Sequence, residues 1–385
     1  MGQRVNLIAM VATVVATIAL VSADAAEAYT LFGRLVPIFA FVTGMSVVVN
    51  IAAQVGVFDA VTRALETVAP VRAGARRQAL WSGLILISIV VTVFLSLDTT
   101  AILLTPLAIA VARRNGLNLM AMAFAVVWIA NIASLHLPVS NLTNLLALSG
   151  GGFASELDYI TAAWVPATIA TGIAVGAALL INRLPERVTS TTADRPRREQ
   201  PTADPLLRPS LITLGLLLPA LASPIPYWLS SSVAAVVMVV LAGIKRPDLL
   251  RVHLIPWPSL LLATAMSTVA TAVSVLGGAQ LVQAMLDDAT PLTIATTGAV
   301  AANLLNNIPA FLALEPAVTT TQEYLALLIG VNTGPIITPW ASLATLLWHD
   351  QLLRAGVQIR WRTFILFGLI LAPVAVVVPA LALML

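Results

Sequence analysis

Long apolar stretches make up most of the chain, and two of them are interrupted at matching places by polar residues and proline. The first interruption covers residues 131–144 and the second covers residues 332–345. Each begins with Asn and has a proline seven residues later, Pro138 in the first and Pro339 in the second. A helix broken by polar residues at membrane depth is tolerated only where it lines a cavity. Paired breaks in the two halves of a chain are typical of a transporter's binding site.

The apolar windows between the loops predict about nine membrane-spanning helices, because a spanning helix needs roughly 20 apolar residues. Lys and Arg gather in short clusters between these windows, and Arg34 alone falls outside them. The positive-inside rule places such clusters in the cytoplasm, together with the N-terminus. The clusters lie at residue 4 and at 63–77, 113–114, 183–208, 245–251 and 354–362.

Two further apolar segments, 78–114 and 291–314, each predict a re-entrant hairpin. The first has a basic pair at both ends, so a single crossing would place one pair outside the cell. The second has no basic residue at either end and is expected to enter from the outside. Two full crossings of the first segment are the alternative, although each arm is short for a crossing.

The order of two spans, a hairpin, a broken span and a last span occurs twice, in opposite orientations. We therefore expect an all-α polytopic membrane protein with two inverted-topology repeats, each with a re-entrant hairpin and a broken transmembrane helix. The first repeat covers residues 1–182, with its broken helix at 118–148. A cytoplasmic linker covers 183–208. A linker helix and the second repeat cover 209–385, with the second broken helix at 324–348.

Composition agrees with a membrane protein, since 59% of the 385 residues are hydrophobic and only 10% are charged. The pI near 9.8 would suit a nucleic-acid partner, but the basic residues sit in loops between apolar segments. The chain has no cysteine, which excludes disulfides and thiolate metal sites. We predict no metal, no cofactor and no enzymatic activity, because no catalytic motif is present. Residues 1–28 could be a cleaved signal peptide, but a retained first helix is favoured.

Asp98 is the most informative single residue for function, as it is the only acid between Glu66 and Glu156. An ionisable group at membrane depth is costly and usually functional. Burial favours the neutral form of a carboxyl, which suits a proton carrier. The structural alternative is that Asp98 caps the second hairpin arm through backbone N–H groups.

Amides and hydroxyls near the breaks and hairpin tips are the predicted substrate ligands. Singly, each could serve as a hydrogen bond between helices. His136 is expected to pack or hydrogen-bond within the first break rather than relay protons, and Glu315 is expected to be solvated. The region contains no Arg or Lys, which favours a neutral hydroxylated substrate or a cation over a multiply charged anion. The predicted ligands are Thr99, Thr100, Asn131, Ser134, Ser140, Asn141, Thr143, Asn306, Asn307, Asn332, Ser342 and Thr345.

Four stretches carry a family resemblance: residues 98–106, 133–144, 306–309 and 330–348. They resemble the arsenical pump membrane proteins, which are arsenite efflux permeases of the ion transporter superfamily. The resemblance implies export of As(III) or Sb(III) across the cell (inner) membrane by an elevator-like step. The driving force would be proton antiport or an associated cytoplasmic ATPase.

The sequence departs from that resemblance at two positions. Some arsenite permeases carry Asp where Asn131 and Asn332 stand, so Asp98 is here the only deep acid. The coupling ion is therefore open between protons and sodium. The alternative function is a sodium- or proton-coupled carrier for a small carboxylate or another anion.

Overall fold

The computed structural model describes residues 3–183, 189–190, 204–221, 223–251 and 254–384. These residues are nearly all helical, which confirms the all-α class. The exception is a two-stranded antiparallel sheet of β1 (Thr189–Ser190) and β2 (Val357–Gln358). The sheet ties the chain between the two halves to the loop before the last helix. Most of the predicted linker at 183–208 lies outside the described residues.

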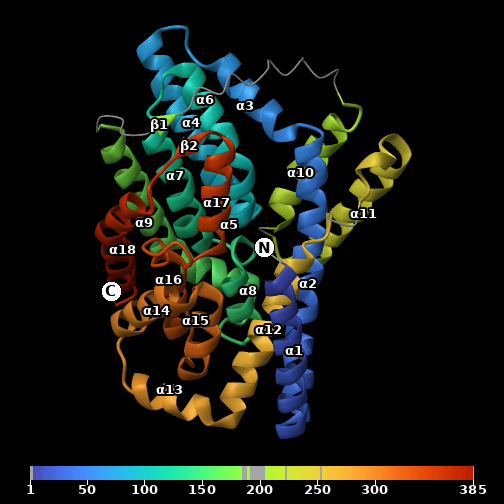
Figure 1. Cartoon of the computed structure of the whole chain (residues 1–385), viewed down its shortest axis with the longest axis vertical. Coiled ribbons are helices and arrows are strands. Elements are labelled where there is room, and N and C mark those ends of the chain that lie inside the picture. Colours follow the sequence, from blue (N-terminus) through green and yellow to red (C-terminus); the bar gives the residue numbers. More distant parts are fainter. Residues whose placement is uncertain (1–2, 184–188, 191–203, 222, 252–253, 385) are drawn as a thin grey trace.

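One group of helices forms the right side of the molecule in Figure 1. Within it, α1 packs on α12 and α2 packs on α11. Each half of the chain thus contributes one helix to each pair, as two inverted repeats would. The group consists of α1 (Gln3–Ala23), α2 (Ala25–Gln54), α10 (Leu207–Leu221), α11 (Tyr227–Lys245), the short η4 (Pro247–Leu249) and α12 (Trp257–Val273).

Two short helices lie at opposite ends of the molecule (Figure 1). Helix α3 (Val57–Val68) follows α2 near the upper end, and its polar and apolar residues fall on separate faces, as a helix on a membrane surface requires. Helix α13 (Ala279–Leu286) lies at the lower end and follows α12 through the π-helical turn η6 (Ser274–Gly278). Helix α3 precedes the first hairpin and α13 precedes the second. Their placement at opposite ends is what two inverted repeats would give.

The first hairpin has two arms that meet at Leu95 and Ser96. Its first arm is α4 (Ala73–Phe94). Its second arm begins with α5 (Leu97–Thr99), continues through the π-helical η1 (Thr100–Leu104) and ends with α6 (Thr105–Asn115). The structure thus breaks this segment beside Asp98, where the sequence predicted the tip.

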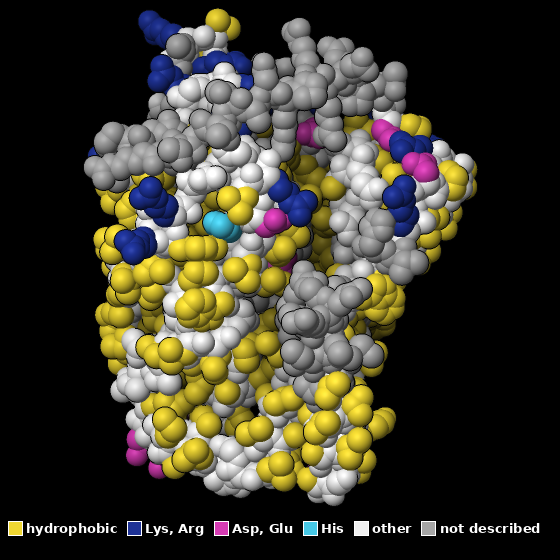
Figure 2. Space-filling model, viewed as in Figure 1, with side chains coloured by type: hydrophobic (Ala, Val, Ile, Leu, Met, Phe, Trp, Pro, Cys, Tyr) yellow, Lys and Arg dark blue, Asp and Glu magenta, His cyan; other side chains and the backbone are white. Residues whose placement is uncertain are grey.

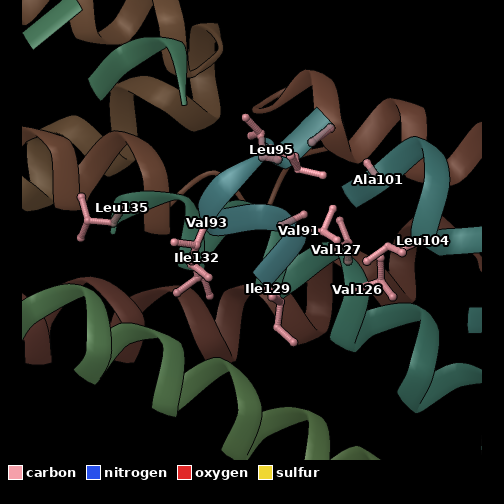
Figure 3. Close-up of a cluster of buried hydrophobic side chains, with 14 of the residues drawn as sticks. Val91, Val93, Leu95, Ala101, Leu104, Val126, Val127, Ile129, Ile132 and Leu135 are labelled. Atoms are coloured by element: carbon pink, nitrogen blue, oxygen red, sulfur yellow. The ribbon is translucent and has the colours of Figure 1, made fainter. Parts of the chain in front are cut away.

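Apolar side chains hold the first hairpin against the next helix, α7 (Leu119–Ile132). Figure 3 shows Val91 from α4 and Leu104 from η1 beside Val126 and Val127 of α7. All of these side chains are buried. The hairpin is therefore fixed mainly by close packing, and the tip is positioned against the following break.

The first broken helix consists of four pieces that precede one long helix. Pro138 interrupts it because proline lacks the N–H that a continuous helix needs. The carbonyl and amide groups freed by the interruption are then available to side chains and ligands. The pieces are α7, η2 (Ala133–Leu135), η3 (Pro138–Ser140) and α8 (Leu142–Ser149), followed by α9 (Glu156–Asn182).

The second half repeats this order with a hairpin, a break and a long helix. Helix α14 packs on α16, and α18 packs on α9 of the first half. The break between α16 and α17 contains Pro335 and Pro339. The elements are α14 (Pro291–Leu305), α15 (Asn307–Leu314), η7 (Glu315–Ala317), α16 (Thr321–Thr333), α17 (Leu343–Arg354) and α18 (Trp361–Ala382).

Six of the described helices are long and apolar enough to cross a membrane. Shorter apolar helices, such as Leu207–Leu221 and Pro291–Leu305, accompany them. The count of about nine spans therefore stays a prediction. In Figure 2, hydrophobic side chains cover the lower part of the visible face, and Lys and Arg are confined to its upper half. This distribution is that of a multi-pass membrane protein with one basic end.

Candidate substrate site

The two hairpin tips have nearly the same backbone geometry. Ser96 has φ 140° and ψ 163°, and Asn306 has φ 131° and ψ 157°. Such angles are rarely adopted by residues other than glycine and cost about 1–3 kcal/mol. Each residue also caps the helix that follows: Ser96 Oγ accepts from Thr99 N at 3.2 Å, and Asn306 Oδ1 accepts from Ile308 N at 3.3 Å. The strained turn is thus a shared feature of both halves.

Asp98 stands at the first tip with an unbonded carboxylate oxygen. Its Oδ1 is shielded from solvent and has no hydrogen-bonding partner in the described chain. The capping role considered for Asp98 belongs instead to Ser96. The predicted ligands Thr99 and Thr100 are engaged within the tip: Thr99 with Ser96 Oγ at 3.0 Å, and Thr100 with Thr92 Oγ1 at 2.8 Å. A carboxyl left in this position is free for a proton or a ligand.

The second tip, in contrast, is bonded to the second break. Asn306 Nδ2 donates to Trp340 O at 2.8 Å, and Asn307 N donates to Ala341 O at 2.9 Å. These bonds place the tip directly beside the start of α17. The predicted ligands Asn306 and Asn307 therefore lie at the meeting point of hairpin and break.

Asn303, which was not among the predicted ligands, makes the strongest link between this hairpin and the break. Its Nδ2 donates to Gly334 O at 2.8 Å, and its Oδ1 accepts from Thr338 N at 3.0 Å. The backbone carbonyl of Asn303 also accepts from Thr338 Oγ1 at 2.7 Å. An Asn one helical turn before a polar tip was the available sequence signal.

A buried network centred on Asn332 joins the two halves; we call it the Asn332 network. Asn332 Oδ1 accepts from Asn141 Nδ2 at 3.0 Å and from Thr143 Oγ1 at 2.7 Å. Asn332 Nδ2 donates to Asn144 Oδ1 at 2.7 Å. All four side chains are at most 3% exposed. Three predicted ligands and their neighbour Asn144 are thus brought together from residues about 190 positions apart.

Two further predicted ligands stabilise the first break itself. Ser134 Oγ donates to Asn131 O at 2.6 Å, and Ser140 Oγ donates to Val93 O at 2.6 Å. The bond from Ser140 connects the break to the first arm of the first hairpin. Their hydroxyl protons are therefore committed to the backbone rather than to a ligand.

A second group of polar residues has side-chain oxygens without such bonds; we call it the open cluster. Its members are Asp98, Thr105, Asn131, Ser342 and Thr345. Each has a side-chain oxygen that is shielded from solvent and has no partner among the described residues. Helix α17 carries Thr345 and has Ser342 as its N-cap, and it packs against α5, η1 and α7, which carry or adjoin the other members. Leaving such groups unpaired costs about 1–3 kcal/mol each, and a ligand bound here would offset that cost.

Glu315 is largely shielded from solvent, and the expectation that it is solvated was wrong. Arg34 Nη2 lies 2.5 Å from Glu315 Oε1, and the two side chains are only 22% and 12% exposed. Arg34 Nη2 also donates to Leu146 O at 3.0 Å, near the end of α8. The pair forms because α2 brings its guanidinium to the end of α8, where the second hairpin also ends.

His136 is packed within the first break, as the sequence favoured. Its Nδ1 lies 3.0 Å from Ala133 O, and its ring meets Trp164 edge-on at 6.0 Å between centroids. The segments 95–106, 131–144, 303–309 and 332–345 contain no Arg or Lys, and Asp98 is their only acid. The site therefore offers amides, hydroxyls and one carboxyl.

Broken helices, paired hairpins and a charge-poor polar centre define an α-helical membrane transporter. The family model described as CitMHS, citrate transporter, matches residues 4–345. The chain therefore belongs to the citrate transporter family.

Individual relatives carry a different name. An arsenical pump membrane protein from Escherichia coli is 28% identical over 326 residues, which is 77% of this chain and 75% of the relative. A protein of the same name from Yersinia enterocolitica is 29% identical over 329 residues, with the same coverage. These relatives agree with the family resemblance expected from the sequence.

One solved structure shares the fold. The YdaH transporter of Alcanivorax borkumensis superposes with a TM-score of 0.60 at 16% sequence identity. The match covers 92% of this chain and 86% of that chain. At this identity the likeness concerns the fold, which is that of a membrane transporter.

Proposed function

We propose that this transporter exports arsenite and antimonite by proton antiport, with Asp98 as the group that carries the proton. The observation that supports the proposal is the unpaired Asp98 carboxyl beside a polar site that lacks basic residues. At neutral pH arsenite is mainly uncharged As(OH)3, whose hydroxyls suit amide and hydroxyl ligands. Thiolate capture of As(III) is excluded because the chain has no cysteine.

In the proposed cycle, the Asp98 carboxyl alternates between a protonated and a charged state. Asp98 takes a proton from the outer side, which neutralises it for movement through the low-dielectric interior. On the inner side it releases the proton, and As(OH)3 binds with its hydroxyls donating to the carboxylate, which offsets that charge during the outward step. Charge on Asp98 thus decides which cargo the moving part carries.

The moving part is proposed to be the group of hairpins and broken helices, sliding elevator-like along the group of α1, α2, α10, α11 and α12. Exchange of partners between halves, α1 with α12 and α11 with α2, supports the two inverted repeats behind this motion. The basic end of the molecule would face the cytoplasm in a bacterial inner membrane, with the N-terminus inside.

A carrier for a small carboxylate is the alternative, and the citrate transporter description of the family favours it. Against it stands the absence of Arg and Lys from the tips and breaks, because a multiply charged anion usually binds a basic group. Helix N-termini can replace part of that charge. Transport of labelled citrate, with and without sodium, separates the two functions.

The experiment is As(III) uptake into inside-out vesicles prepared from cells that lack their own arsenite pump. An imposed pH gradient should drive accumulation by the wild type, while Asp98→Asn should lose gradient-driven accumulation by at least ~100-fold, about 2.7 kcal/mol. Asp287→Asn is the matched control, since Asp287 is an exposed acid at the end of α13. It should transport as the wild type does.

Two results would contradict the proposal. Wild-type vesicles that contain the protein but accumulate no As(III), with or without ATP and a cytoplasmic fraction, would favour the carboxylate function. Full gradient-driven uptake by Asp98→Asn would remove Asp98 as the proton carrier.

A further inference from the structure

The two breaks are built on the same backbone plan, so their side chains can be compared position by position. Asn131 at the end of α7 corresponds to Asn332 at the end of α16, which follows it by 201 positions. The same shift relates Asn141 to Ser342, and their backbones agree closely: φ −148° and ψ 142° against φ −143° and ψ 138°. Both residues are the N-caps of the second helix piece. Thr345 is the counterpart of Asn144.

Where α8 meets α16, this plan gives a structure in which the polar side chains are fully hydrogen-bonded. Helix α8 packs on α16, and Asn332 bonds to three side chains of α8 and its cap. The remaining groups of Asn144 donate to Ser134 O at 2.7 Å and Leu137 O at 2.9 Å. No buried side-chain polar atom of the Asn332 network lacks a partner within the described chain.

Where α17 meets α7, the side chains at the corresponding positions have oxygens without hydrogen bonds. Asn131 Oδ1, Ser342 Oγ and Thr345 Oγ1 have no hydrogen-bonding partner in the part of the chain described. Their residues are at most 1% exposed. Ser342 caps α17 by position, but its side chain accepts no bond. Thr105 and Asp98 on the adjoining hairpin add two more unbonded oxygens.

Helix contacts bring Ser342 close to the level of Asn131. Trp348 Nε1 donates to Ala123 O at 2.8 Å, which fixes α17 against α7. Arg113, in the last turn of α6, donates through Nη2 to Gly356 O at 3.2 Å. Because α7 begins shortly after α6, the end of α17 lies near the start of α7, and the two helices are antiparallel. Counting back from Trp348, Ser342 lies level with Ile129. At about 1.5 Å per residue, it is within roughly 3 Å of Asn131 along the axis.

We propose that this transporter binds its cargo on one side only, in the open cluster where α17 packs on α7. On the other side, where α8 packs on α16, the Asn332 network permanently connects the two halves. The inference rests on the proposed function and refines it, because it removes Asn141, Thr143 and Asn332 from the ligand set. It retains Asn131, Ser342 and Thr345 as ligands, adds Thr105, and keeps Asp98 beside them as the proton carrier.

The chemistry of the open cluster defines the cargo class. All five free atoms are oxygens, and the only ionisable one belongs to a carboxyl. Hydroxyls of Ser and Thr can both donate and accept, and an amide oxygen accepts. The cluster therefore suits a small neutral molecule with several hydroxyls, or a cation when Asp98 is charged. It contains no group that would balance the charge of a polyanion.

The absence of cysteine from the chain makes a direct test possible, since each introduced thiol is the only one. Thr345→Cys and Thr143→Cys are matched, because both threonines are fully buried in corresponding helices. In vesicles of both orientations, a small charged methanethiosulfonate should modify Thr345→Cys at least tenfold faster than Thr143→Cys. Ser342→Cys should react like Thr345→Cys.

Equal rates, or faster modification of Thr143→Cys, would overturn the one-sided site. Thermal unfolding in detergent gives a second measure if a thiol variant is poorly produced. Thr143→Val should lower the melting temperature because it loses the bond to Asn332, whereas Thr345→Val should leave it unchanged or raised. The reverse order would also overturn the inference. Labelling does not depend on arsenite, so failed As(III) uptake with one-sided labelling would count against the proposed function alone.

Discussion

The two hairpin tips are alike in backbone and opposite in bonding. Ser96 and Asn306 adopt the same disfavoured conformation, and each caps the next helix. The second tip is then tied to its break through Asn303, Asn306 and Asn307. The first tip presents Asp98 with a free oxygen. A repeated backbone can thus serve as structure in one half while its counterpart keeps polar groups available.

The largest effect on stability is expected where the two breaks differ. Asn332→Ala leaves Asn144 Oδ1 without its donor and removes three buried bonds, so the free energy of unfolding should fall by about 3 kcal/mol. Asn131→Ala loses only one bond, to Val127 O, and also removes an unpaired oxygen. Its cost should stay below about 1 kcal/mol. Denaturation in detergent measures both, and equal losses would refute the contrast.

A smaller effect is expected within the hairpins. Asn303→Ala removes the bonds to Gly334 O and Thr338 N, which should lower stability by about 2 kcal/mol. Thr105→Ala in the first hairpin removes a hydroxyl that bonds to no described residue, so stability should change by less than about 0.5 kcal/mol. Thermal unfolding of the two purified variants checks the difference. A Thr105→Ala loss as large as that of Asn303→Ala would show that the first hairpin is bonded as well.

The smallest effect tests what the tips share. Ser96→Gly relieves a conformation that glycine adopts freely and sacrifices a cap worth only a few tenths of a kcal/mol against glycine, so it should stabilise by about 1 kcal/mol. Ser96→Ala keeps the strain and loses the cap, and should destabilise by about 1 kcal/mol. Asn306→Gly should gain less, because it also loses the bond to Trp340 O. The order of melting temperatures is the measurement, and a loss with Ser96→Gly would contradict the strain argument.

Local sequence was sufficient to predict the helical class and to single out the segments where the chain breaks. Pro138 and Pro339 remove backbone donors wherever they stand, so their effect needs no tertiary information. The same holds for Asp98, whose position beside Ser96 in an apolar segment indicated a special site. The use of Ser96 as the cap was missed, because an acid and a hydroxyl near a helix start are both good caps.

Features that depend on distant residues could not be predicted. The bonds of Asn332 to Asn141 and Asn144 connect residues about 190 positions apart, and nothing in either segment specifies the other's register. Glu315 looked solvated because its partner Arg34 is far away in sequence. The division into bonded and unbonded oxygens follows from this packing, which is why the sequence alone could not separate ligands from structural residues in either half.

The ion pair of Arg34 and Glu315 also sets an order of events during synthesis. Glu315 follows Arg34 by 281 residues, and at about 5–20 residues per second the ribosome needs roughly 14–56 s to reach it. During that interval, α2 carries a guanidinium without its carboxylate. The ion pair therefore forms only after the second hairpin has been made, and a truncated first half would leave the Arg34 guanidinium with the Leu146 carbonyl but without its carboxylate.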